Sequence, residues 1–423
     1  MNFFGWRSCC ALLLAVLCAA PLAAGKAFGD SHHFALSVQR AKADPRGAFA
    51  EWAAHFGRGY AAGSDEFEAR LGVWLHTLRH VLAAPLADAM VPVNGFADLG
   101  DDEFRAAYLG QVTPEDDEGN VALGGTVGKR KAEKYRYEHV QPPAAVDWRP
   151  KEIIGPVKDQ HVNGSACGCC WAFATIGTAE CMVAMATGKV LSLSEQQLID
   201  CDRGPPLYDL GCDGGNFEGG ILYISENGID LESDYPYLAK DSVCRRASGK
   251  KKEGRRAAAL DGFGDIPRAN ETALMQAVSQ HPSTVAVCCG PFIEAWRNYT
   301  GGIFDIAGAT VPGGCTRPLD HALVAVGYGT TAQGQGFWVL KNSWGAHWGD
   351  RGFMYVPRNT GGKGACGLAA APGYAIKKGV NAEGDALIDA ATWSKPDPSA
   401  ALTMSRAERL SLGSARAAIT PAL

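Results

Sequence analysis

The 423-residue sequence lacks an excess of basic charge, because 40 Lys and Arg stand against 45 Asp and Glu, for a formal net charge of -5. Such a chain has no general attraction for phosphate, so we expect no nucleic-acid partner. Its one basic run joins Lys250–Lys252 to Arg255 and Arg256, and we interpret it as a solvated loop. With 47% hydrophobic and 20% charged residues, the composition is that of a globular protein and excludes a fibre or a disordered polymer.

The sequence also lacks, beyond its N-terminus, any run of about 18 uninterrupted apolar residues such as a membrane helix needs. The N-terminus itself has Arg7, an apolar stretch from Cys10 to Ala20, and small residues at Leu22–Ala24. This order is typical of a secretory signal peptide, to which we assign residues 1–24. We therefore expect a protein of the secretory pathway, in a lysosome-like compartment or secreted, with no membrane partner.

Cysteine, in contrast, is plentiful: 14 are present, and three of them lie in the signal peptide. In an oxidising compartment most of the remainder should pair, and their odd number leaves at least one thiol over. Three fall within four positions, at Cys167, Cys169 and Cys170. Sequons at Asn163, Asn270 and Asn298 predict surface glycosylation.

The first part of the mature chain has a helical pattern and ends in a polar connector. Between Phe49 and Val81, apolar and aromatic residues recur at helical spacing. One face carries Glu66, Arg70, Trp74, Thr77 and Val81. Residues 111–139 contain an acidic and a basic cluster and almost no apolar residues, which predicts an exposed, protease-sensitive linker.

The chain beyond this linker changes from helices to strands. Residues 170–186 predict a buried helix that is apolar nearly all round, and LSEQQLID predicts a helix with a Ser N-cap. After about residue 257, short strands alternate with Gly-rich turns: STVAVCC, HALVAVGYG, GFWVLKNSW and GFMYVPR. A groove between a helical half and a β half is a common place for a site.

Four residues of this region could form one reactive site. Cys170 opens the buried helix, where the helix N-terminus and a nearby imidazolium would lower the pKa of the thiol. His321 opens a strand and could face that helix end, and Asn342 ends the next strand and could orient the imidazole. The side-chain amide of Gln160, with the Cys170 N–H, could stabilise an oxyanion.

Several longer motifs resemble those of the papain-like cysteine proteases of the cathepsin L type. They cover about residues 140–376 and include PVKDQ…CGCCWAF, LSEQQLIDCD, GCDGG, YPY, GGIF, LDHALVAVGYG and KNSWGAHWGDRGF. Glu66, Arg70, Trp74 and Val81, followed by NGFADLGDDEF, resemble the family's inhibitory pro-segment. Thr77 stands where that pro-segment usually has Asn, and Pro92 stands where its second motif has Gly.

The resemblance implies an α+β, papain-like fold of two lobes, one helical and one like a β-barrel, after a helical inhibitory pro-domain. We expect the pro-domain in residues 25–110, the linker with the activation cleavage in 111–139, the catalytic domain in 140–378 and a C-terminal extension in 379–423. The implied activity is that of a cysteine endopeptidase made as a zymogen. Cys170 would be the nucleophile, His321 the general base and acid, Asn342 the orienting residue and Gln160 the oxyanion donor.

The resemblance also implies disulfides and a substrate site. The expected pairs are Cys167–Cys212, Cys201–Cys244 and Cys315–Cys366, and Cys181, Cys288 and Cys289 are left as small buried hydrophobes. Gly214 and Gly215 would pair with the substrate backbone. The pocket for the side chain two before the cut would be lined by Asn216, Phe217, Ala286, Leu319, Ala322 and Ala371. Ala371 at its floor predicts a preference for Leu, Phe or Val.

Two further residues beside the expected catalytic groups can be assigned from the same motifs. Trp344 would shield the His321–Asn342 pair from water. Asp320 either tunes the pH profile or is a solvated carboxylate. No insertion after Cys201 resembles an occluding loop, which favours an endopeptidase over a dipeptidase.

Two departures from the family pattern leave alternatives open. Cys169 stands where relatives usually have Ser, and it is either a tolerated substitution or one half of a strained, reducible link to Cys170. Four extra residues precede Cys167, and Asn163 lies within them. They either bulge into solvent and leave Gln160 in its role, or move it away from the oxyanion.

The expected partners are peptide and protein substrates, the chain's own pro-segment as inhibitor, and cystatin-type inhibitors. We expect a monomer without cofactor or metal. Two other readings compete with the protease. One is a catalytically impaired papain-fold binding protein. The other is a metal site built from Cys167, Cys169, Cys170 and His161, which lacks a second ligand pair at zinc spacing.

Overall fold

The computed structural model describes residues 34–82, 90–110, 133–162, 165, 167–203, 209–245, 256–304 and 319–379. The predicted signal peptide, residues 111–132 of the linker and the C-terminal extension from residue 380 lie outside the described residues. Asn163, Cys315 and most of the basic run at Lys250–Arg255 lie outside them as well. Below, residues 34–110 are called the N-terminal region and residues 133–379 the C-terminal region.

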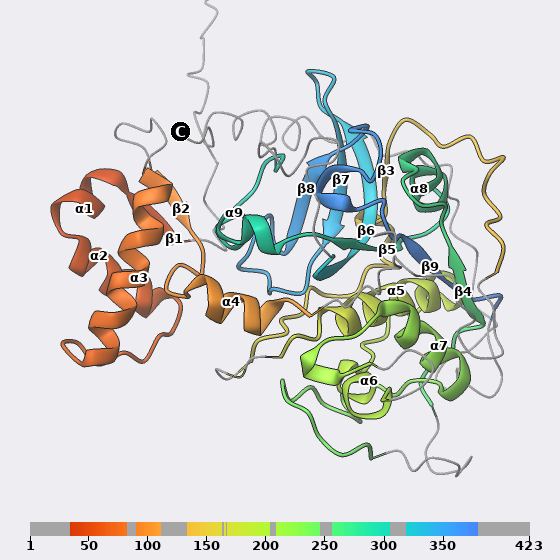
Figure 1. The fold of residues 1–423 in the computed structure, drawn as a ribbon, viewed down its shortest axis with the longest axis horizontal. Helices are drawn as coiled ribbons and strands as arrows, with labels where there is room; N and C mark the ends of the chain where they lie inside the picture. Colours follow the sequence, from red (N-terminus) through yellow and green to blue (C-terminus); the bar gives the residue numbers. More distant parts are fainter. Residues whose placement is uncertain are drawn as a thin grey trace, which may run out of the picture. The chain divides into compact units, whose positions relative to one another are not determined.

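The N-terminal region consists of helices and a small antiparallel sheet (Figure 1). Its helices are α1 (Val38–Ala43), α2 (Pro45–His55), α3 (Asp65–Leu82) and α4 (Asp101–Tyr108), and its strands are β1 (Phe34–Ser37) and β2 (Met90–Val93). The predicted helical segment from Phe49 to Val81 is thus interrupted. The break contains Gly57 and Gly63, whose φ angles of 64° and 81° are left-handed and favour glycine.

The buried face of α3 differs from the predicted one. Its buried residues are Phe67, Leu71, Trp74, Thr77 and Leu78, so the stripe includes Trp74 and Thr77 but not the exposed Glu66. Arg70 serves another purpose, because its Nη1 donates to Glu103 Oε2 at 2.8 Å and to the Asp98 carbonyl at 3.1 Å. Arg70 of the predicted face therefore links α3 to α4 and to the chain just before α4.

The described part of the C-terminal region has five α-helices, and the first two begin where the sequence predicts. The five are α5 (Cys170–Thr187), α6 (Glu195–Cys201), α7 (Phe217–Asn227), α8 (Glu271–Val278) and α9 (Ile293–Arg297). The predicted Ser N-cap of α6 is confirmed, since Ser194 Oγ accepts from the Gln197 N–H at 3.0 Å. Within the described residues α5 is long and apolar enough to cross a membrane, but it is 89% buried inside the protein, as a central core helix is.

The strands of the C-terminal region form one antiparallel sheet of seven strands. They are β3 (Val146–Asp147), β4 (Gly262–Asp265), β5 (Ser283–Val287), β6 (His321–Thr330), β7 (Gly336–Lys341), β8 (Phe353–Pro357) and β9 (Gly373–Ile376). Their order is β4-β9-β5-β6-β7-β8, with β3 paired to β6. The four predicted strands are confirmed as β5 to β8. Helix α5 lies between β6 and α7, so its first residue is brought to the junction of helices and sheet (Figure 1).

The last residues of the predicted linker, 133–139, are not wholly exposed as expected. They are hydrogen-bonded to later parts of the C-terminal region, with the Glu133 N–H donating to the Phe263 carbonyl at 3.0 Å. The Tyr135 hydroxyl donates to the Ala273 carbonyl at 2.7 Å, and the Tyr137 hydroxyl lies 2.8 Å from His281 Nε2. The rings of these two tyrosines are apolar surface that this polar stretch can bury. The prediction of exposure rested on the charged residues and did not take the tyrosines into account.

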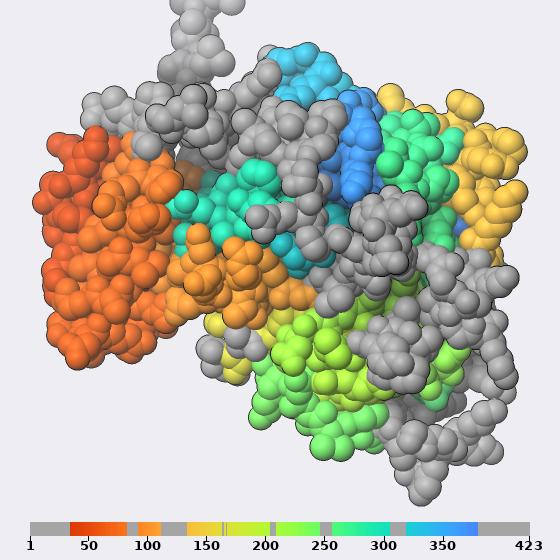
Figure 2. Space-filling model, viewed as in Figure 1, coloured from red at the N-terminus to blue at the C-terminus, as the bar shows by residue number. Residues whose placement is uncertain are grey.

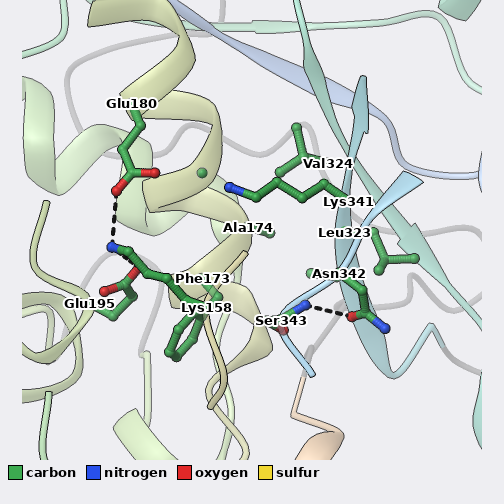
Figure 3. A pocket seen from close by; sticks show the side chains of 12 residues that line it. Lys158, Phe173, Ala174, Glu180, Glu195, Leu323, Val324, Lys341, Asn342 and Ser343 are labelled. Carbon is green, nitrogen blue, oxygen red and sulfur yellow. Dashed lines mark hydrogen bonds and ion pairs between the residues drawn. The ribbon is translucent and has the colours of Figure 1, made fainter. Parts of the chain in front are cut away.

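Buried charges line a cavity of about 20 Å³ between α5 and strands β6 and β7 (Figure 3). Lys158 Nζ lies 2.9 Å from Glu180 Oε1 and 2.7 Å from Glu195 Oε1, and each of the two carboxylate side chains is 1% exposed. Burial by itself would lower the pKa of Lys158, but the two carboxylates outweigh it and raise that pKa above its ordinary value. Lys158 is therefore the charge that makes burial of the two acids tolerable.

We predict that Lys158→Met lowers the free energy of unfolding by about 3–5 kcal/mol, because two buried carboxylates lose their common cation. Urea unfolding of the full chain, followed by Trp fluorescence in a Cys170→Ala background, measures the change. Lys378→Met is the matched control, because it breaks the exposed Lys378–Glu133 pair and should cost less than about 1 kcal/mol. Equal stability of the two variants would contradict the role given to Lys158.

Candidate active site

Cys170 is the first residue of α5, and it is buried. The first turn of a helix has N–H groups without helical partners, so it favours a negative charge. Cys169 occupies the N-cap position and makes no side-chain capping bond, which leaves that field unopposed at Cys170. Burial raises the pKa of the Cys170 thiol, and hydrogen bonding from the backbones of Ala322, Gly110 and Trp171 acts in the opposite direction.

His321 is the first residue of β6, directly before Ala322, and is held by Asn342 at the end of β7. Its Nε2 lies 2.9 Å from Asn342 Oδ1, which also accepts from the Ser343 N–H at 2.8 Å. Because an amide oxygen only accepts, Nε2 carries the hydrogen and Nδ1 carries the lone pair. His321 Nδ1 is buried and has no hydrogen-bond partner in the part of the chain that the structure describes.

Trp344 covers the imidazole, as predicted from its position. Its ring centroid is 4.6 Å from that of His321, and it is itself buried. The N-terminal region covers Trp344 in turn, because Phe104 stacks edge-on against it at 4.8 Å and Tyr108 lies at 5.7 Å. The His321–Asn342 pair is therefore shut off from water on this side.

The side-chain amide of Gln160 lies between Ala107 of the N-terminal region and Cys167, although extra residues follow Gln160 in the sequence. Its Nε2 donates to the carbonyls of Ala107 and Cys167, both at 3.1 Å. Ser343 fixes the other end, because its Oγ donates to Gln160 Oε1 at 2.8 Å. The Gln160 NH2 group therefore binds one backbone carbonyl of the N-terminal region and one of the C-terminal region, and its role as oxyanion donor stays a prediction.

Gly110 of the N-terminal region connects the two halves of the site. Its N–H donates to the Asp320 carbonyl at 3.0 Å, and its carbonyl accepts from the Gly215 N–H at 2.9 Å. A Cβ at Gly110 would lie 1.7 Å from the Gly168 carbonyl oxygen, so this approach is open only to glycine. Gly215 thus pairs with a backbone of the chain's own N-terminal region, and its pairing with a substrate backbone stays a prediction.

Burial favours the neutral form of both reactive groups. It raises the pKa of the Cys170 thiol to about 12, even though three N–H groups favour the thiolate. It lowers the pKa of His321 to about 4, against the hydrogen bond to Asn342 that favours the charged form. A thiol that ionises only above its pKa and an imidazole that is protonated only below its pKa are both uncharged at neutral pH.

The vicinal link between Cys169 and Cys170 is not formed, since both are free thiols. Cys169 faces the other way, with its Sγ 3.1 Å from the Tyr237 hydroxyl, which donates to the Gln160 carbonyl at 2.6 Å. Cys169 therefore supports the loop that carries Gln160. The alternative metal site is wrong as well, because Cys167 is held in a disulfide and His161 packs against Tyr108.

Two of the three predicted disulfides are present, Cys167–Cys212 and Cys201–Cys244. The third, Cys315–Cys366, is not formed: Cys366 carries a free, buried thiol, and Cys315 lies outside the described residues. Cys181, Cys288 and Cys289 are buried, as predicted.

Five of the six predicted pocket residues lie in one buried apolar cluster, namely Phe217, Ala286, Leu319, Ala322 and Ala371. The sixth, Asn216, caps α7 by accepting from the Glu218 N–H at 3.0 Å. Asp320 is not a solvated carboxylate, because its two oxygens accept from the Cys289 and Gly290 N–H groups at 2.7 and 2.9 Å.

Two of the three sequons fall on described residues. Asn270 is exposed at the N-cap of α8, and Asn298 is half-buried after α9. An exposed Asn270 is open to modification, so its glycosylation stays a prediction.

The sequence analysis did not predict the residues that hold the four expected catalytic residues in position. Tyr237 and Ser343 both lie inside motifs that drew attention, YPY and KNSWG, but nothing local indicates that they grip Gln160. Ala107, Tyr108 and Gly110 follow the recognised pro-segment motif directly. The signal that could have found Gly110 is a glycine placed at the end of an amphipathic helix just before the polar linker.

We predict that Gly110→Ala exposes Cys170, because the added Cβ excludes the bound backbone. Alkylation of Cys170 by iodoacetamide at pH 7 should speed up about tenfold for every unit that its pKa falls. Mass spectrometry of the Cys170 peptide over the first minutes, with the chain still intact on a gel, measures the rate. Gly100→Ala is the control, since a Cβ there meets only Glu103 Oε2, at 3.6 Å. Equal rates in the two variants would refute the blocking contact.

The chain is similar to known proteins over most of its length. Residues 142–376 match the family described as Papain family cysteine protease. Cysteine protease 1 of Oryza sativa subsp. japonica is 37% identical over 367 residues, which cover 83% of this chain and 69% of the rice protein. The senescence-specific cysteine protease SAG12 of Arabidopsis thaliana is 36% identical over 333 residues, or 77% of this chain and 88% of SAG12.

Solved proforms match the N-terminal region too. The proform of the ragweed pollen allergen cysteine protease Amb a 11 has a TM-score of 0.65 at 27% identity, covering 83% of this chain and all of the allergen chain (100%). Digestive procathepsin L 3 of the Tenebrio molitor larval midgut has a TM-score of 0.62 at 28% identity, covering 78% and 99% of the two chains. This chain therefore belongs to the papain family of cysteine proteases and is made as a proenzyme, with the N-terminal region as its pro-segment.

Proposed function

We propose that the mature protein is an endopeptidase that cleaves peptide bonds through a Cys170 thioester, with His321 as general base and acid. The observation that carries this proposal is the state of His321. Asn342 holds its Nε2–H, and its Nδ1 has no hydrogen-bond partner in the described chain. The backbone of Ala322, the residue directly after His321, hydrogen-bonds the Cys170 thiol, which supports a position of this imidazole from which it can take that thiol's proton.

The steps follow from these positions. Nδ1 takes the thiol proton, and the sulfur attacks the substrate carbonyl carbon. The oxygen becomes an anion that the Gln160 NH2 and the Cys170 N–H stabilise. Its collapse expels the amine, which receives the proton from Nδ1, and leaves a thioester. Water, deprotonated by the same nitrogen, attacks the thioester and releases the acid and the Cys170 thiol.

The N-terminal region inhibits in two ways. It fills the substrate edge, since Gly110 takes the hydrogen bonds that a substrate backbone would make to Gly215 and Asp320. It also removes water from both reactive groups, which keeps the pKa of Cys170 at about 12 and that of His321 at about 4. Its departure re-hydrates the pair, and the helix N-terminus then favours thiolate and imidazolium.

Acid favours that departure by weakening the fold of the N-terminal region, within which two carboxylates are paired with arginines. Arg46 lowers the pKa of Glu68. Burial alone would raise the pKa of Glu103, but Arg70 and a backbone N–H outweigh it and lower that pKa. A carboxylate with a lowered folded-state pKa stabilises the fold above its unfolded pKa, and this contribution is lost as the pH falls through the folded value. Asp98 acts in the opposite sense, because burial raises its pKa.

Location and specificity follow from the same features. The predicted signal peptide and two disulfides support a secretory route to a lysosome-like compartment or to the outside. The apolar cluster that holds Ala371 supports a preference for Leu, Phe or Val two residues before the cut. Cystatin-type inhibitors remain expected partners by resemblance. A catalytically impaired binding protein is the alternative, but the retained position of Gln160 speaks against it.

The direct test is processing and labelling. At mildly acid pH with reductant, the wild-type chain should lose residues up to about 139 and then react with an epoxysuccinyl inhibitor at Cys170, identified by peptide mass. Cys170→Ala should do neither. His321→Ala, which keeps the thiol, should label and turn over at least about 100-fold more slowly. Labelling of the processed wild type without turnover of any peptide would favour the binding protein.

Pocket specificity has its own test. We predict that Ala371→Glu raises kcat/KM for substrates with Arg two residues before the cut by about tenfold or more relative to Leu, because a charge-assisted hydrogen bond is worth about 1.5–3 kcal/mol. Ala371→Gln is the control of equal size without charge. If both variants change the ratio equally, or neither does, Ala371 does not lie at the floor of this pocket.

A further inference from the structure

Three side chains with metal-binding chemistry meet where the N-terminal region contacts the C-terminal region. His76 and His80 lie on α3, and Glu294 lies on α9. His76 Nδ1 is 3.7 Å from Glu294 Oε1, and His80 Nε2 is 3.2 Å from the same oxygen. One ligand atom from each residue lies within 4.8 Å of the other two.

This spacing is that of a metal site before the ion is bound. Zinc bonds of about 2.0–2.1 Å to nitrogen and oxygen put neighbouring ligand atoms of a tetrahedron about 3.3 Å apart. Two of the three separations, 3.2 and 3.7 Å, are close to that value. Histidines four residues apart project from one face of a helix, and these two rings have their centroids 5.0 Å apart. Small side-chain rotations would bring the third pair of atoms into range.

The carboxylate is left unsatisfied as it stands. Glu294 Oε1 is buried and accepts no hydrogen bond within the described residues, although two imidazole nitrogens lie close to it. A buried polar atom without a partner costs free energy. Arg297, on the same helix, forms an ion pair with Asp101 of the N-terminal region at 3.3 Å. A cation between Glu294 and the two imidazole lone pairs would satisfy all three groups.

An ion could reach this place from solvent after folding. The side chains of His76 and His80 are 57% and 54% exposed, and that of Glu294 is 30% exposed. Figure 2 shows the orange surface of the N-terminal region against the teal surface around α9, where these residues lie. Neither histidine belongs to the motif that resembles the family's pro-segment, and neither contacts the catalytic groups described above.

We propose that His76, His80 and Glu294 bind one Zn²⁺ ion, with water as the fourth ligand, and that this ion ties the pro-segment to the catalytic domain. Two imidazoles and one carboxylate suit zinc, whereas calcium and magnesium prefer all-oxygen sites. The complete ligand set exists only while α3 is docked on α9. By linkage, zinc therefore stabilises the docked proenzyme and slows release of the pro-segment.

The test uses the full-length Cys170→Ala chain, which has no reactive thiol to bind zinc and does not process itself. Isothermal titration with Zn²⁺ at neutral pH should show one equivalent bound, and Co²⁺ should give the visible absorption of a four-coordinate ion. His76→Ala, His80→Ala and Glu294→Gln should each abolish both signals. His139→Ala is the matched control, because that exposed histidine also lies 3.3 Å from a carboxylate, on Glu138, and should bind as the parent does.

Thermal unfolding gives the second readout. Zinc should raise the unfolding midpoint of the Cys170→Ala chain and leave that of the His76→Ala/His80→Ala variant unchanged. Absence of stoichiometric binding, or binding unaffected by the two histidine changes, would overturn the site. Full affinity in Glu294→Gln would confine the ion to α3 and overturn the link between the two regions. Because no step needs turnover, failure here would leave the proposed peptidase activity untouched.

Discussion

The backbone of Gly110 is the contact on which the rest of the proenzyme depends. One N–H and one carbonyl of a single residue bind Asp320 on the side of the sheet and Gly215 on the side of the helices. No side chain could occupy the space between this backbone and the Gly168 carbonyl. The chain thus places its least bulky residue where the two halves of the site come closest, and α4 delivers the aromatic rings of Phe104 and Tyr108 onto Trp344 beside it.

The docking of the N-terminal region affects the protonation states of Cys170 and His321 without any covalent change to either residue. Cys170 and His321 are placed by α5 and β6 in the proenzyme, with Asn342 and Gln160 already held by Ser343. What differs from a reactive pair is the absence of water, which favours the neutral forms of both. The proenzyme therefore carries an assembled site that is kept uncharged, and activation needs removal of a cover more than rearrangement of the catalytic groups.

Two helices and four strands of the C-terminal region could be predicted from local sequence patterns alone. The apolar run after Cys170 and the Ser194 cap specify α5 and α6, and the alternating strands specify β5 to β8, because each is a matter of periodicity and capping. The break between α2 and α3 was missed, since the apolar spacing continues across Gly57 while its left-handed backbone does not continue the helix. The thiol of Cys366 was assigned to a disulfide with Cys315 by resemblance, whereas in the structure it is free and buried.

Contacts between distant segments had no such signal. His76 and Glu294 are separated by more than 200 positions, and each is an ordinary surface residue in its own helix. The hydrogen bond from the Tyr237 hydroxyl to the Gln160 carbonyl could not be predicted either, because it depends on the loop after α7 folding back over the residues before α5. Tertiary packing supplies these pairings, so only coordinates can reveal them.

The anchoring of residues 133–139 has a mechanical consequence. Glu133, Tyr135 and Tyr137 are bonded to the body of the enzyme and not to the inhibitory helices. A first cut upstream of residue 133 would leave residues 133–139 bound to the enzyme until they are trimmed, while the chain before the cut loses its covalent link to the enzyme. The inhibitory region then becomes a separate molecule. Its rebinding is intermolecular and depends on its concentration in solution, and no longer on the effective concentration set by a covalent linker.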